Sequence, residues 1–174
     1  YKRQLIPKDH RERILEQLNT EDELHLDLRT LTFGFCLPKF LTGKPPAALD
    51  ALEFSAGTVE GKTDSHKKTQ LAFWRELAEH GVTPDQAINS AKRFKKAFSS
   101  VEKQLADQAF LFGDEISIVD IVWFIYAHRL KSTGYPFKRL HPGLECWYRA
   151  ILSRPEIVKE VADPVPLKVI RYLT

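Results

Sequence analysis

A run of apolar residues in the second half of the chain constrains the fold more than any other feature. Between Ile118 and Ala127 the only charged residue is Asp120, and the run ends at His128-Arg129. A helix that is apolar on nearly every side has to be surrounded by other elements. Spanning a membrane takes about 20 apolar residues, more than this run contains. The pattern therefore predicts a buried helix, from Ser117 to about Thr133, at the centre of a bundle.

Apolar residues spaced three or four apart predict further helices around it. The first segment, from about Lys8 to Phe35, is interrupted at residues 19–23, where Thr20 and Glu23 have the spacing of a capping box. This segment is therefore either one bent helix or two. Other helices are expected over residues 47–54, 63–80, 83–105, 141–152 and 155–161. Since no segment alternates as a strand would, the predicted fold class is all-α, a helical bundle of about six helices.

Residues 36–61 form the least regular stretch, because prolines and glycines interrupt it repeatedly. A short helix over residues 47–54 is the one regular element expected there. Long loops in compact domains are often functional, so this region is of interest. The tail from Asp163 contains two further prolines and is expected to lie extended over the surface.

Composition narrows the function classes. The chain is 43% hydrophobic and 28% charged, as ordinary globular proteins are, and its net charge of +3 indicates neither a nucleic-acid nor a membrane partner. Its two cysteines, Cys36 and Cys146, lack zinc-binding spacing, so we expect no metal site and a reducing, cytoplasmic setting. The chain starts at Tyr1 and contains no methionine, which leads us to expect a piece of a longer protein.

The helix expected over residues 83–105 has a basic outer face. It carries Lys92, Arg93, Lys95 and Lys96. Acidic residues are interspersed nearby and no aromatic platform accompanies the cations, as a nucleic-acid surface would require. We interpret this face as a solvated helix exterior.

Ser117 and Asp120 form the most informative local pattern. Ser117 directly precedes the buried helix, and Asp120 follows three residues later. In a capping box the serine oxygen accepts a hydrogen bond from the amide of Asp120, and the carboxylate accepts one from the amide of Ser117. In a buried helix these bonds pair amide groups that water cannot reach.

This region resembles the C-terminal, all-helical domain of the glutathione S-transferase family. There, a turn similar to Phe110–Gly113 precedes a capping box similar to Ser117–Asp120 on the central helix. The segment 144–161, with its Arg154-Pro155 junction, resembles the two helices that follow, and Leu5–Asp9 resembles the linker from the thioredoxin-like domain. The enlarged segment between residues 36 and 80 is similar to reductive dehalogenase and etherase relatives and to the ganglioside-induced differentiation-associated branch.

The resemblance implies a domain organisation and a function. Residues 1–7 would be the linker from a thioredoxin-like domain missing from this chain, and residues 8–174 the helical domain. The parent protein would be a cytosolic transferase that directs the thiolate of glutathione, its cosubstrate, at a small hydrophobic electrophile, in conjugation or in reductive thiol transfer. Homodimerisation is usual in the family. Carried over by position, the substrate-binding candidates are His25, Arg29, Thr32 and Phe33, with Cys36 near the helix end.

Alternative interpretations accompany these candidates. Arg29 would otherwise pair with Asp27 or another acid, and the aromatic residues Trp123 and Tyr126 would belong mainly to the core. The chain offers no catalytic residue, triad or phosphate loop of its own, so by itself it is not expected to catalyse a reaction. Domains of this type also serve as non-catalytic protein-interaction modules, which is the second candidate function.

Overall fold

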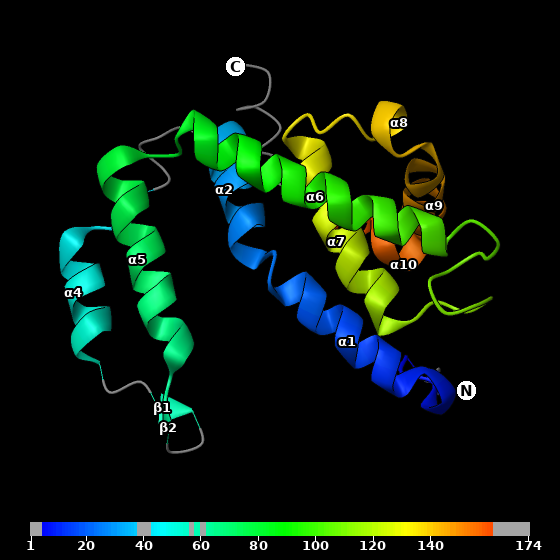
Figure 1. Ribbon diagram of the computed structural model, residues 1–174, viewed down its shortest axis with the longest axis horizontal. Coiled ribbons are helices and arrows are strands. Elements are labelled where there is room, and N and C mark those ends of the chain that lie inside the picture. The colour runs from blue at the N-terminus through cyan, green and yellow to red at the C-terminus, as the bar shows by residue number, and fades with distance from the viewer. Residues whose placement is uncertain (1–4, 38–42, 56–57, 60–61, 162–174) are drawn as a thin grey trace.

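The computed structural model describes residues 5–37, 43–55, 58–59 and 62–161 (Figure 1). Its fold is all-α, as predicted. A short 3-10 helix, Lys8–His10, precedes the α-helices. These are α1 (Arg11–Asp22), α2 (His25–Phe35), α4 (Pro46–Phe54), α5 (Ser65–His80), α6 (Pro84–Gln104), α7 (Ile118–Ser132), α8 (Phe137–Leu140), α9 (Pro142–Leu152) and α10 (Pro155–Val158). The tail expected to be extended from Asp163 lies outside the described residues.

The first predicted segment consists of two helices, α1 and α2. The capping box expected at Thr20 and Glu23 is wrong: Thr20 lies inside α1, and its hydroxyl donates to the carbonyl of Glu16 over 3.0 Å. The residue before α2 is Leu24, which makes no side-chain cap and is 5% exposed. Burial of an apolar side chain, rather than a polar cap, therefore accompanies the break.

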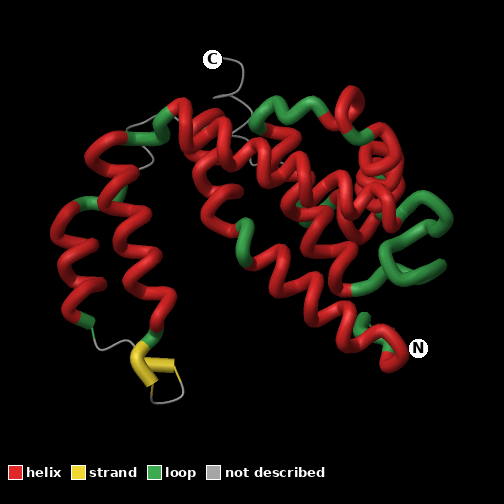
Figure 2. The backbone as a smooth tube through the Cα atoms, in the orientation of Figure 1, coloured by secondary structure: helices red, strands yellow, loops and turns green. Residues whose placement is uncertain are grey.

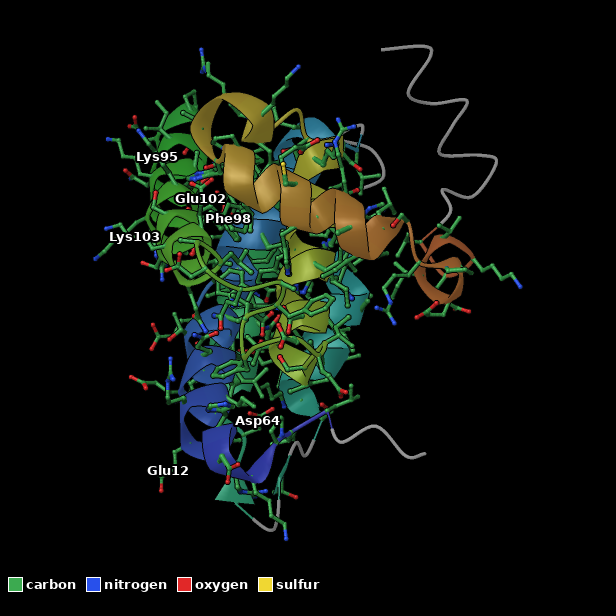
Figure 3. All side chains as sticks on the ribbon, turned by 90° about the vertical axis from the view of Figure 1, so that its right-hand side faces the viewer. Glu12, Asp64, Lys95, Phe98, Glu102 and Lys103 are labelled. Atoms are coloured by element: carbon green, nitrogen blue, oxygen red, sulfur yellow. The ribbon has the colours of Figure 1, made fainter. Side chains whose placement is uncertain are left out.

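The core lies between α6 and α7, which cross the length of the bundle (Figure 2). Helix α2 packs on both, α1 packs along α7, and α9 closes the other side against both. Phe94 and Phe98 on α6 and Phe124 on α7 are among the largest fully buried side chains. Figure 3 shows Phe98 inside the bundle, whereas Lys95 and Lys103 on the basic face of α6 point outward.

A helical hairpin stands beside this bundle. Helices α4 and α5 pack against each other and lie at the left of Figure 1, away from α7 and α9. A two-residue strand pair not predicted from the sequence, β1 (Thr58–Val59) and antiparallel β2 (Lys62–Thr63), lies between them. Phe33 on α2 joins the hairpin to the bundle, because its ring lies 5.4 Å from that of Trp74 and 6.4 Å from that of Phe73. The enlarged segment is therefore a second layer against α2.

Helix α7 begins with both hydrogen bonds of a capping box. The hydroxyl of Ser117 accepts from the amide of Asp120 over 3.4 Å, and the carboxylate accepts from the amide of Ser117 over 2.9 Å. Both residues are at most 1% exposed. The amide of Ile118 donates to the carbonyl of Leu5, so the residues that precede α1 are held against the start of α7. As a result α1, α2 and α7 run in the same direction along the bundle.

Candidate functional site

Three of the four predicted substrate-binding residues lie on one stripe of α2. His25, Arg29 and Thr32 are spaced four and three residues apart, which places them on the same side of a helix. Each is half-buried, as is Cys36, which follows the last residue of α2 on the same stripe. The stripe lies between α7 on one side and the α5 hairpin on the other. Because these side chains are only partly covered, a ligand can reach this edge of α2 in the folded domain.

His25 meets α7 through a chain of hydrogen bonds. Its Nδ1 lies 3.3 Å from the hydroxyl of Tyr126, which is also hydrogen-bonded to Glu21 at the end of α1. Burial raises the pKa of Tyr126, and the interaction with Glu21 raises it further, so the hydroxyl stays protonated. Either nitrogen of a neutral imidazole can carry the proton, so the tautomer of His25 decides which of the two atoms donates. Burial lowers the pKa of His25, which keeps its ring neutral.

Arg29 does not form an ion pair with Asp27, the acid two residues before it on α2. Asp27 belongs to another side of α2, where Ser90 donates to it over 2.8 Å and Arg93 forms an ion pair over 2.6 Å. Arg29 donates instead to the amide oxygen of Gln70 on α5. Its guanidinium lies 5.7 Å from the ring centre of Trp74. The pairing of Arg29 with Asp27, one of the two interpretations of its role, is therefore wrong.

Arg129 on α7 is a member of this site that the sequence analysis missed. It follows Tyr126 by three residues, so it lies one turn further along the same side of α7. Burial lowers its pKa, and the positive charge of Arg29 lowers it further. The spacing Tyr126–Arg129 was a usable signal, but basic residues near the end of a helix are common because they interact favourably with its dipole.

Thr32 and Phe33 have mainly structural contacts. The hydroxyl of Thr32 donates to the carbonyl of Leu28 over 2.7 Å, within α2 itself. Phe33 packs on the aromatic residues of α5. The structure thus brings His25 and Arg29 together with Tyr126 and Arg129, and it places Phe33 at the border with the hairpin.

A separate hollow of about 560 Å³ lies between α1 and α6, on another side of the bundle. Trp123 of α7 contributes to its lining. The indole nitrogen of Trp123 is buried without a hydrogen-bond partner among the described residues. The hollow mixes cations such as Arg13 and Lys96 with the acids Glu16 and Glu23, so it shows no single charge preference. Its mixed charge makes it the weaker candidate for a substrate.

The described part of the chain shows neither a metal-binding cluster nor a helix that could span a membrane. No group of three or more histidine, cysteine, aspartate or glutamate side chains there is arranged to hold a metal ion. Among the same residues, none of the helices combines the length and the apolar content that crossing a bilayer requires.

Known proteins similar to this chain share one family. The family model for the glutathione S-transferase C-terminal domain matches residues 68–150. Glutathione S-transferase U27 of Arabidopsis thaliana is 27% identical over 120 residues, which are 60% of this chain and 53% of that protein. Glutathione S-transferase hmp2 of Hypomyces subiculosus is 36% identical over 92 residues, which are 52% of this chain and 42% of that protein. The chain contains a glutathione S-transferase C-terminal domain.

The fold of this glutathione S-transferase domain is also found in a solved structure. The crystal structure of the beta-etherase LigF from Sphingobium sp. strain SYK-6 matches with a TM-score of 0.66 over 91% of this chain and 65% of that one, at 21% identity. Because 91% of the chain is matched, the match includes at least part of the segment between residues 36 and 80. The chain spans about half the length of the curated relatives it matches.

The family match and the candidate site overlap in part. Residues 68–150 include α6, α7 and most of α5 and α9, and therefore Tyr126 and Arg129. His25 and Arg29 lie outside the matched segment. The α2 side of the site in this glutathione S-transferase domain is thus described by its geometry alone.

Proposed function

We propose that this chain is the electrophile-side domain of a glutathione-dependent transferase. In this proposal residues 1–7 are the linker from a thioredoxin-like domain, residues 8–174 are the helical domain, and the protein acts in the cytoplasm as a homodimer. Glutathione is the cosubstrate and is bound mainly by the thioredoxin-like domain. The observation that carries the proposal is a polar wall on α2 and α7, formed by His25, Arg29, Tyr126 and Arg129. It lies in a fold whose relatives are named as glutathione S-transferases.

The wall suits the reception of an electrophile rather than the activation of a thiol. His25 is neutral and hydrogen-bonded to Tyr126, whose hydroxyl is in turn bonded to Glu21. Tyr126 is 5% exposed, so its hydroxyl lies inside the domain rather than open to the thiol of glutathione. Phe33 and Trp74 supply an aromatic border against which a hydrophobic electrophile can pack. Attack by the thiolate of glutathione forms a carbon–sulfur bond, and the leaving group departs with the bonding electrons.

The test uses the full-length protein and a chloronitrobenzene. Glutathione-dependent release of chloride, together with retention on immobilised glutathione, is the expected result. Residues 1–174 expressed alone are expected to show neither. A full-length protein that neither binds glutathione nor accelerates the reaction, yet captures a stable protein partner, would instead be an interaction module.

A further inference from the structure

Two arginines of the candidate site have no acidic partner among the residues that the structure describes. Four other arginines each form an ion pair with a carboxylate: Arg75 with Glu53, Arg93 with Asp27, Arg149 with Glu145 and Arg154 with Glu156. Within the described part of the chain, Arg29 and Arg129 form no such ion pair. Arg29 instead contacts a neutral amide and an indole ring. Arg11, Arg13 and Arg139 form no described ion pair either, but they are exposed, whereas Arg29 and Arg129 are half-buried.

The register of the two helices places these arginines at the same height. The contact of His25 with Tyr126 fixes one level of α2 against α7. Arg29 follows His25 by four residues and Arg129 follows Tyr126 by three, and both helices run in the same direction (Figure 1). One helical turn therefore separates each arginine from the contact, on facing sides. Their guanidinium groups interact electrostatically across that space.

The surroundings strengthen the positive potential. The ammonium group of Lys44 lies 4.7 Å from the ring centre of Trp74, which also carries Arg29 on its ring. Glu21 and Asp22 are acids that act electrostatically on Tyr126 in this site. Both lie at the end of α1, a turn or more before Arg29 in the sequence. Like charges held together in a half-buried position cost free energy that a bound anion would recover.

We propose that Arg29 and Arg129 together bind a carboxylate group of a bound substrate. Arginine presents a planar fork of N–H donors that matches a carboxylate, and Arg29 keeps donors free after bonding Gln70. Phe33 and Trp74 lie beside the pair, so an aromatic carboxylate would fit both the charge and the rings. The inference rests on the proposed function for the statement that the ligand is a substrate.

The carboxylate has two possible sources, the electrophile and glutathione, and a matched pair of electrophiles separates them. In 4-chloro-3-nitrobenzoate and 4-chloro-3-nitrobenzamide, the thiolate of glutathione displaces chloride from the same ring position. One reagent carries a carboxylate and the other a neutral amide. The full-length protein is assayed as wild type and as Arg29→Gln and Arg129→Gln. Arg139→Gln, on the exposed surface of α8, is the matched control.

With the electrophile as the source, each site variant is expected to raise the KM for the benzoate about tenfold. The KM for the benzamide should change less than twofold, and Arg139→Gln should change neither. With glutathione as the source, the KM for glutathione should rise about tenfold with both electrophiles alike. Equal losses for benzoate and benzamide without a change in the KM for glutathione would overturn the proposal.

Calorimetric titration of the same proteins with the benzoate and with glutathione tests binding apart from activity. The wild type should bind one of the two with an affinity about tenfold higher than either site variant. A protein that transfers no glutathione but shows this difference would disprove the proposed function and support the carboxylate site. Equal affinity in wild type and variants, or no binding of either ligand, would disprove the site.

Thermal unfolding distinguishes ligand binding by Arg129 from a purely structural role of this residue. Removing one of two repelling charges should leave the Tm of Arg129→Gln unchanged or higher. If Arg129→Gln unfolds several degrees earlier and loses affinity for benzoate and benzamide alike, Arg129 has a structural role and the proposal fails. Arg29→Lys offers a second check, because it keeps the charge but not the fork and should restore only part of the carboxylate affinity.

Discussion

The indole nitrogen of Trp147 on α9 donates to Oδ1 of Asp120 on α7 over 3.2 Å. The same oxygen accepts from the amide of Leu111 over 2.9 Å, while Oδ2 accepts from the amide and the hydroxyl of Ser117. Asp120 has no solvent exposure. One buried carboxylate therefore joins the turn before α7, the start of α7 and the helix packed against it.

Asp120→Ala is expected to destabilise the domain far more than loss of an ordinary helix cap. It leaves the amides of Leu111 and Ser117 and the indole of Trp147 buried without an acceptor, at about 1–3 kcal/mol for each unpaired group. Allowing for relaxation and water entry, we expect a loss of about 3–5 kcal/mol in the free energy of unfolding. Ser117→Ala, which removes the cap hydroxyl alone, should cost about 1 kcal/mol. Urea unfolding of both variants measures the difference, and equal losses would contradict this account.

The bond between Trp147 and Asp120 should appear as a coupling energy. We expect the double variant Trp147→Phe with Asp120→Ala to lose about 1 kcal/mol less than the sum of the two single variants. Trp147→Phe keeps an aromatic ring in the core and removes the N–H. The cycle is measured by urea unfolding, with Trp123→Phe in place of Trp147→Phe as the control, since Trp123 makes no hydrogen bond to Asp120 in the described structure. Strict additivity for the Trp147 pair would show that the bond contributes nothing.

Asp27 is expected to hold α2 in the position on which the site depends. Its carboxylate accepts from Ser90 on α6 and pairs with Arg93, and its side chain is 11% exposed. Asp27→Ala should cost about 2 kcal/mol, because it removes a buried anchor between two helices. Arg93→Ala should cost less, since the side chain of Arg93 is 54% exposed and water can replace part of the pair. Chemical unfolding at low and high salt measures both, and the reverse order would contradict the anchoring role.

Local patterns made much of the fold predictable. The apolar run after Ser117 indicated a buried helix because a helix without a polar side must be covered, and α7 is that helix. The break between α1 and α2 was located, but its cause was not. Thr20 has the chemistry of a cap, yet the chain turns where Leu24 enters the core. Whether a side chain such as Leu24 is buried depends on how all the helices pack together. A capping pattern in the sequence carries no information about that packing.

The site was less predictable, for the same reason. His25 and Arg29 could be proposed from their place on one helix. Tyr126 was expected in the core and is indeed 5% exposed, but its hydroxyl reaches His25 across the interface. Arg129 belongs to the site only through the register of α7 against α2. Contacts between residues about 100 positions apart depend on tertiary packing, which helix periodicity does not report.

Acidification should weaken the fold through His141, which is 1% exposed at the start of α9. Burial raises the pKa of Tyr135 to about 12, and its hydroxyl lies 3.0 Å from Nε2 of His141. Nδ1 lies 3.4 Å from Glu102, but burial outweighs this carboxylate and lowers the pKa of His141. The unfolded chain therefore takes up a proton at a higher pH than the folded one.

The contribution of His141 to stability is thus present above the pKa of the unfolded histidine, about 6.5, and is lost as the pH falls toward the folded pKa. In that window the free energy of unfolding should fall by up to about 1.4 kcal/mol per pH unit, the limit for one proton. His141→Gln should remove this slope, even if it lowers stability at pH 7.5. His25→Gln is the control for the other histidine with a lowered pKa. Urea unfolding between pH 7.5 and 5 makes the measurement, and an unchanged slope in His141→Gln would assign the acid sensitivity to other groups.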